Sequence, residues 1–217
     1  MVTKTHIQRP SQQFTKPSKL FRDASLCFIA CEGSKTEAQY FAFRFLQHSR
    51  VKLEVIPSEN GCSAPVYVLD GLKKAVRNFN LQDDDSLWLG IDRDRWPYPN
   101  QIQEVTHKSI QKKPIRLIVS SPCFELWLYL HFAEMPSKSI STSKELEPML
   151  RNVLGSYSKS SLQEDDYRER VQIAIERSEQ TCLGSDELPT NPGTTVHELV
   201  KTILAMRPKA DRTALGL

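Results

Sequence analysis

The sequence predicts an α/β protein in which a parallel sheet of about four strands is flanked by helices and followed by a helical C-terminal lobe. Up to about residue 132, short apolar runs alternate with longer segments of helical period. The short runs are apolar at nearly every position, which is typical of strands that are covered on both faces. Beyond about residue 136 the chain is polar, and its apolar residues recur with helical period.

Four segments have the length and the apolarity of strands: residues 26–30, 52–57, 86–91 and 115–120. Helices are predicted over residues 36–47, 64–79, 100–111, 124–132, 143–154, 163–180 and 195–206. We expect the first of these helices to be largely buried, because Tyr40, Phe41 and Phe43 crowd its surface. The pattern predicts no further strand after Pro122.

We divide the chain into a basic flexible arm (1–24), an α/β domain (25–135) and a helical lobe packed on it (136–217). The first 22 residues carry five Lys or Arg and no acid. Such an arm is either a solvated terminus or a contact for phosphate backbones.

The composition indicates a soluble globular protein, with 39% hydrophobic and 25% charged residues and a net charge of +3. No apolar run approaches the roughly 18 residues of a membrane span, and the first residues lack the apolar stretch of a signal peptide. We therefore expect no membrane contact and a cytoplasmic location. The five cysteines are scattered and never two residues apart, so neither a disulfide framework nor a zinc site is indicated.

Acidic residues follow two of the predicted strands. Glu32 comes directly after the first strand, and Glu37 lies early in the helix that follows. Asp92 and Asp94 come after the third strand, one residue apart, so their side chains point the same way if the backbone is extended. Because parallel strands end at the same edge of a sheet, we expect these carboxylates to converge there.

Converging carboxylates repel one another, and a divalent cation relieves that repulsion. Magnesium suits such a site because it prefers hard oxygen ligands. Taken singly, each motif also has a simpler interpretation, since an acid and a glycine after a strand are commonly a turn and an Asp-x-Asp loop commonly faces solvent. The order of the motifs along the chain is what favours a shared site.

The carboxylate motifs CEGSKTEAQYF and GIDRDRW resemble the Toprim domain of topoisomerases, bacterial primases and OLD-type nucleases. Three further strings, SSPCFELWLYLHF, GSYSKS and NPGTTVHELV, follow in order. Together the five motifs, within roughly residues 25–205, resemble the RloB-like family of bacterial and phage-defence proteins.

The resemblance implies that Glu32 is a metal ligand or general acid/base and that Asp92 and Asp94 hold Mg²⁺ (or Mn²⁺). Toprim domains often carry a third aspartate two residues further on, where this chain has Trp96. Glu37 and Glu125 are the candidates to complete the site.

Glu125 has two interpretations, because an acid in the first turn of a helix also complements the helix dipole. Lys159, in GSYSKS, is either a solvated loop lysine or a clamp for a phosphate. His131 is more simply a packed residue than a catalyst.

The resemblance implies two hypotheses. The first is a magnesium-dependent nuclease that cleaves DNA or RNA, such as tRNA, as an effector of anti-phage defence. The second is a non-catalytic module that binds nucleic acid or a partner ATPase. An inhibitor protein and association of the chain with itself are further hypotheses about partners.

Overall fold

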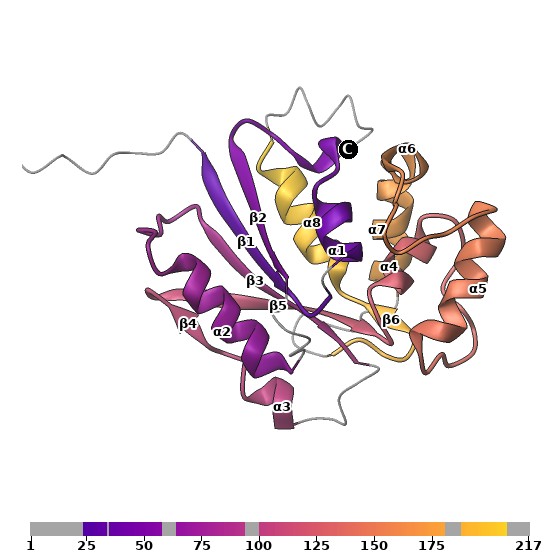
Figure 1. Ribbon diagram of the computed structural model, residues 1–217, viewed down its shortest axis with the longest axis horizontal. Coiled ribbons are helices and arrows are strands. Elements are labelled where there is room, and N and C mark those ends of the chain that lie inside the picture. Colours follow the sequence, from indigo (N-terminus) through magenta and orange to yellow (C-terminus); the bar gives the residue numbers. More distant parts are fainter. Residues whose placement is uncertain (1–23, 34, 58–63, 94–99, 181–187, 208–217) are drawn as a thin grey trace, which may run out of the picture.

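A central sheet with four parallel strands organises the protein (Figure 1). The computed structural model describes residues 24–33, 35–57, 64–93, 100–180 and 188–207. The parallel strands are β1 (Ser25–Cys31), β2 (Val51–Pro57), β3 (Ser86–Asp92) and β5 (Lys113–Ser121), in the spatial order β2-β1-β3-β5. The predicted α/β fold class is therefore confirmed.

Two short strands that the sequence pattern did not predict lie on β5. Among the described residues, β4 (Ser109–Ile110) pairs antiparallel with the start of β5 and β6 (Gly193–Thr194) with its end. The expectation of no strand after Pro122 is thus wrong. Each of these strands has two residues, which is too few for apolar periodicity to be visible in the sequence.

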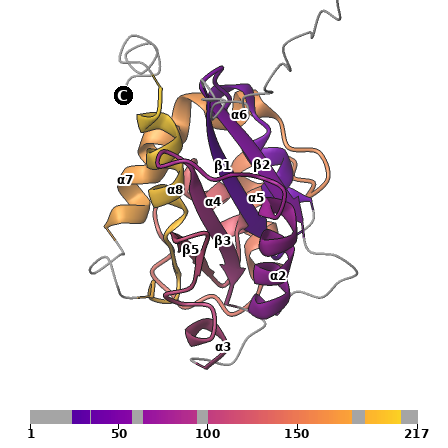
Figure 2. The same ribbon diagram turned by 90° about the vertical axis from the view of Figure 1, so that its left-hand side faces the viewer.

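Both faces of the sheet are covered, as the continuous apolar runs predicted (Figure 2). On one face, α2 (Pro65–Val76) and α3 (Asn100–Gln103) enclose a core that includes Phe28 and Leu89. On the other, Ile29 and Trp88 pack in a larger core with α1 (Thr36–Phe41), α4 (Glu125–Leu130), α7 (Val171–Glu179) and α8 (Val196–Ala205). Successive residues of β1 therefore point into different cores.

Helical segments beyond α4 complete the second face. They are α5 (Ser143–Leu154), which packs on α4, then α6 (Glu164–Tyr167) and the 3₁₀ turn η2 (Arg168–Arg170), which lead into α7. The bounds of α5 match the prediction. The last helix, α8, packs against β5, so this part of the chain contributes both a helix and the strand β6 to the central sheet region.

Most predicted helices are shorter than the sequence suggested, the one predicted over 163–180 is interrupted by η2, and two others differ most. The first ends at Phe41 and is followed by a 3₁₀ turn, η1 (Arg44–Leu46), whose first N–H groups bond to the carboxylate of Glu164 and which buries Phe45 and Leu46. The second, predicted over 100–111, keeps only α3 as a helix. Its end becomes strand β4, and His107 and Gln111 have positive φ angles, which an α-helix excludes.

Several earlier expectations fall on residues outside the described ranges. These are the basic arm, Asp94 and Trp96. Within the described residues, none of the helices combines the length and apolarity needed to cross a membrane.

The carboxylate of Glu164 caps η1, so its removal should destabilise the fold. It accepts hydrogen bonds from the backbone N–H groups of Arg44 (3.0 Å) and Phe45 (3.1 Å). Glu164→Ala should lower the free energy of unfolding by about 1–2 kcal/mol, because two donors lose their acceptor. Asp165→Ala, a loss of charge in the same first turn of α6, is the matched control, and equal losses in chemical denaturation would contradict this role.

Candidate acidic site at the carboxyl edge of the sheet

Glu32 and Asp92 meet at the carboxyl edge of the parallel sheet. The backbone N–H of Glu32 donates to the carbonyl of Gly90 at 3.2 Å, which extends the pairing of β1 with β3. In return, the backbone N–H of Asp92 donates to Oε2 of Glu32 at 3.2 Å. Glu32 is buried and Asp92 is partly buried. The edge therefore places the two acids side by side, as expected from the sequence.

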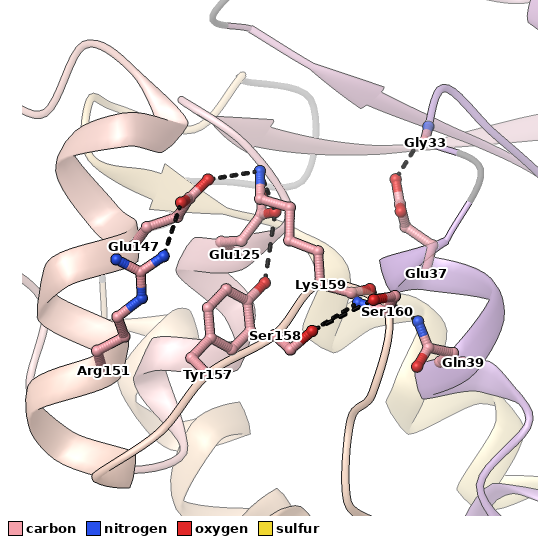
Figure 3. Close-up of polar contacts among 10 residues, drawn as sticks. All are labelled: Gly33, Glu37, Gln39, Glu125, Glu147, Arg151, Tyr157, Ser158, Lys159 and Ser160. Atoms are coloured by element: carbon pink, nitrogen blue, oxygen red, sulfur yellow. Dashed lines mark hydrogen bonds and ion pairs between the residues drawn. The ribbon is translucent and has the colours of Figure 1, made fainter.

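Glu37, in the first turn of α1, points back to the same edge. Its Oε1 accepts a hydrogen bond from the backbone N–H of Gly33 at 3.1 Å, as Figure 3 shows. A Cβ atom on Gly33 would lie 2.3 Å from the carboxylate oxygens of Glu37, so any larger residue here would displace that carboxylate. The turn after β1 is thus shaped around the Glu37 side chain.

The environment of Glu37 disfavours its negative charge. Burial, opposed by the hydrogen bonds that the carboxylate accepts and reinforced by the charges of Glu125 and Glu32, raises its pKa from 4.5 to about 7. Burial likewise raises the pKa of the Cys31 thiol, to which the nearby charges of Glu37 and Asp92 add. These effects show that the acids that follow β1, end β3 and begin α1 and α4 lie near one another.

Glu125 begins α4, as predicted, and it is paired with a lysine from a distant part of the chain. The ammonium of Lys159 lies 2.9 Å from Oε1 of Glu125 and 3.0 Å from Oε1 of Glu147 (Figure 3). Burial opposes the charge of Lys159, but the two carboxylates outweigh burial and raise its pKa. The hydroxyl of Tyr157 makes a long contact of 3.5 Å to the same oxygen of Glu125. Lys159 is therefore not a freely solvated loop lysine.

The segment that carries Lys159 is attached to α1 through Gln39. The side-chain amide of Gln39 donates to the carbonyl of Lys159 at 2.8 Å and to the carbonyl of Lys35 at 2.9 Å, while its oxygen accepts from the N–H of Leu162 at 3.0 Å. Because α1 also carries Glu37, this one side chain fixes the lysine segment relative to the acidic edge.

Sequence reasoning missed Glu147 and Gln39. Glu147 lies four residues before Arg151, and the two form an ion pair at 3.5 Å, so its spacing indicates only an ordinary surface pair on α5. Gln39 lies within a run of core aromatics. No pattern in the sequence distinguishes either residue from its neighbours.

The structure places His131 and the α1 aromatics in the core. His131 is fully buried, with Nδ1 3.0 Å from the carbonyl of Trp127 and Nε2 3.2 Å from the hydroxyl of Tyr40. Burial lowers its pKa to about 3. It is therefore a neutral packing residue, consistent with the simpler interpretation.

The donor chemistry at the edge is suited to magnesium, although no closed cage is formed by the residues that the structure describes. Glu32, Asp92 and Glu37 offer hard carboxylate oxygens, and the pKa of Glu37 is raised first by burial and further by the charges of Glu125 and Glu32. Within the described ranges, which exclude Asp94, no group of three or more His, Cys, Asp or Glu is arranged to hold a metal ion. Glu125 already has a cationic partner in Lys159.

The pKa of Glu37 makes stability depend on pH. A carboxyl whose pKa is higher in the folded protein binds its proton more tightly there, so stability is greatest below pH 4.5 and falls as the pH rises through about 7. Glu37→Gln should remove this loss, worth about 3 kcal/mol at pH 8 relative to pH 4.5, while keeping an acceptor for Gly33.

Urea unfolding of the wild type and of Glu37→Gln across that pH range measures the effect. The exposed Glu169→Gln variant controls for net charge. If the difference between Glu37→Gln and the wild type does not change with pH, the carboxyl does not titrate as described.

Comparison with known proteins gives a single assignment for the chain. The family model described as RloB-like protein matches residues 27–203, a range that includes most of β1, the acidic edge, Lys159 and most of α8. No curated protein and no solved structure gives a significant match. Because the model covers most of the sequence, the chain belongs to the RloB-like protein family.

Proposed function

We propose that the protein is a magnesium-dependent nuclease whose active site is the acidic edge of the sheet. The observation that carries the proposal is the meeting of Glu32 and Asp92 at the ends of β1 and β3, with Glu37 and Glu125 close by. Carboxylates gathered from four elements repel one another, and such a costly cluster is typical of a functional site.

Glu32 and Asp92 would hold the cation, which is magnesium or manganese. The cation, when bound, orients a phosphodiester, polarises its oxygen and activates water. Lys159 offers a positive charge that can contact a phosphate oxygen near the acids, and Gln39 holds its segment in place. Asp94 belongs to the same motif and lies outside the described residues.

The substrate class and the biological role rest on the resemblance to Toprim-containing proteins. We propose nucleic acid as the substrate, with tRNA or another RNA as one form, and a role as an effector of anti-phage defence. An effector of this kind needs restraint, which an inhibitor protein or a partner ATPase would provide.

One observation favours the alternative of a non-catalytic module. Lys159 neutralises the charge of Glu125. Among the described residues, no three His, Cys, Asp or Glu side chains are arranged to hold a metal ion. A binding module would use the same edge without hydrolysis. Cleavage assays separate the two functions.

Asp92→Asn should reduce metal-dependent cleavage by at least about 100-fold, because it removes a charge from the proposed cation site while keeping the shape of the side chain. End-labelled RNA and single- and double-stranded DNA, incubated with magnesium or EDTA, provide the assay. Asp70→Asn, on the exposed face of α2, is the matched control and should cleave like the wild type.

Metal-dependent cleavage that persists in Asp92→Asn would refute the assignment of the active site. Nucleic-acid binding by a wild type that cleaves none of these substrates would favour the non-catalytic module.

Glu125→Gln separates a direct role of Glu125 in cleavage from its other contacts. We expect cleavage to fall by about 100-fold at limiting magnesium, while the free energy of unfolding changes by less than about 1 kcal/mol. Glu147→Gln is the control because it removes the other carboxylate that holds Lys159. Equal losses of cleavage in both variants would show that Glu125 acts only by holding Lys159, and full activity in Glu125→Gln would exclude both roles.

A further inference from the structure

A cavity of about 790 Å³ lies along the outer edge of β5, apart from the acidic site. Its walls come from α3 and the turn that follows, from β5, and from the start of α8. In Figure 2, α8 lies to the left of β5 and α3 lies below. This volume is in the range of about 300–1,000 Å³ that is typical of small-molecule sites.

The cavity exists because the outer edge of β5 is covered only at its ends. Strand β4 pairs with Lys113 and Pro114, and β6 pairs with Ser120 and Ser121. Thr195 exchanges hydrogen bonds of 2.9 Å with the backbone of Val119. Among the described residues, the stretch around Leu117 has no strand beside it on this edge, and it is too short for an added peptide strand.

The lining of the cavity is strongly basic. It contains Lys108, Lys112 and Arg116 but one carboxylate, Glu198, whereas the whole chain has 29 Lys and Arg to 26 acids. The guanidinium of Arg116 lies 5.2 Å above the ring of Trp88, which restrains its position. Because Glu198 lies near Arg116 and offsets part of its charge, Lys108 and Lys112 supply most of the net positive charge that an anion in the cavity would meet.

The cavity also has an apolar surface. Leu188 lines it and is 38% exposed, and Leu117 of β5, which packs on the core with one side, is only partly buried. A ligand that suits both features has an apolar part and a phosphate-like anionic part. A nucleotide has both.

We propose that this cavity binds a nucleotide, with its base on the apolar surface near Leu117 and Leu188 and its phosphate at Lys108, Lys112 and Arg116. The nucleotide is either a free molecule or one unit of a single strand. The inference does not depend on the proposed nuclease activity.

One contact links the cavity to the acidic edge. Arg93, which directly follows Asp92, donates from Nη1 to the carbonyl of Pro189 at 2.7 Å, and Pro189 lines the cavity. The wall of the cavity therefore contacts the residue that follows Asp92. A free nucleotide bound there would be in a position to influence the same edge.

The test measures binding in EDTA, where metal-dependent cleavage cannot occur. The probes are AMP and ATP, by calorimetry, and fluorescein-labelled single-stranded RNA and DNA 12-mers, by anisotropy. Lys108→Glu/Lys112→Glu should weaken binding at least about 10-fold. Lys52→Glu/Lys73→Glu makes the same change in net charge at two exposed lysines on β2 and α2, and it should weaken binding less than about 2-fold.

Binding of AMP identifies a free-nucleotide site, and binding of the 12-mers alone identifies a subsite for a strand; either result supports the proposal. Leu188→Asn should weaken AMP but not inorganic pyrophosphate, because it removes apolar surface from the cavity without changing its charge. Equal losses in the two lysine pairs, no binding of any probe, or equal binding of pyrophosphate and AMP would each overturn it. The nuclease proposal is tested by cleavage with magnesium and this one by binding in EDTA, so a failure of either stays distinguishable from a failure of the other.

Discussion

The parallel pairing of β1 with β3 is the constraint on which the candidate site depends. Its register, with Cys31 opposite Gly90, makes the two strands end where Glu32 can accept the N–H of Asp92. At the other end, the buried carboxylate of Asp85 accepts the N–H of Leu26 at 2.7 Å and so holds the start of β1 against the segment that leads into β3. A slip of one residue would turn each side chain of β1 to the opposite face and would separate the acids.

Charge compensation at the edge connects the two halves of the chain. The parallel strands, α1 and α4 supply acids, and Lys159, which pairs with Glu125 of α4, comes from the segment between α5 and α6. Gln39 fastens that segment to α1 by hydrogen bonds to backbone groups. The helical part therefore contributes to the electrostatics of the site as well as to the core.

The sequence predicts the sheet well because buried parallel strands are apolar at every position. The four parallel strands lie within two residues of their predicted bounds, and the shared edge of Glu32 and Asp92 follows from their order. The sequence pattern does not predict elements that are fixed by contacts between residues far apart in the chain. Strand β6 is fixed by pairing with β5, η1 by the carboxylate of Glu164, and the partners of Lys159 by packing of α4 and α5.

The acidic edge and the basic cavity along β5 carry opposite charges, and a phosphodiester substrate would use both of them. Acids alone would repel such a substrate from the edge, so any phosphate that approaches Glu32 and Asp92 needs a cation beside it. Lys159 is positioned to provide one such charge, and its pairing with Glu125 and Glu147 keeps it ordered. The basic lining along β5 lies on the other side of the Arg93–Pro189 contact and offers the remaining attraction. Under these proposals, the cations of the cavity would supply most of the affinity for the nucleic acid, and the acids of the edge would supply the reactivity.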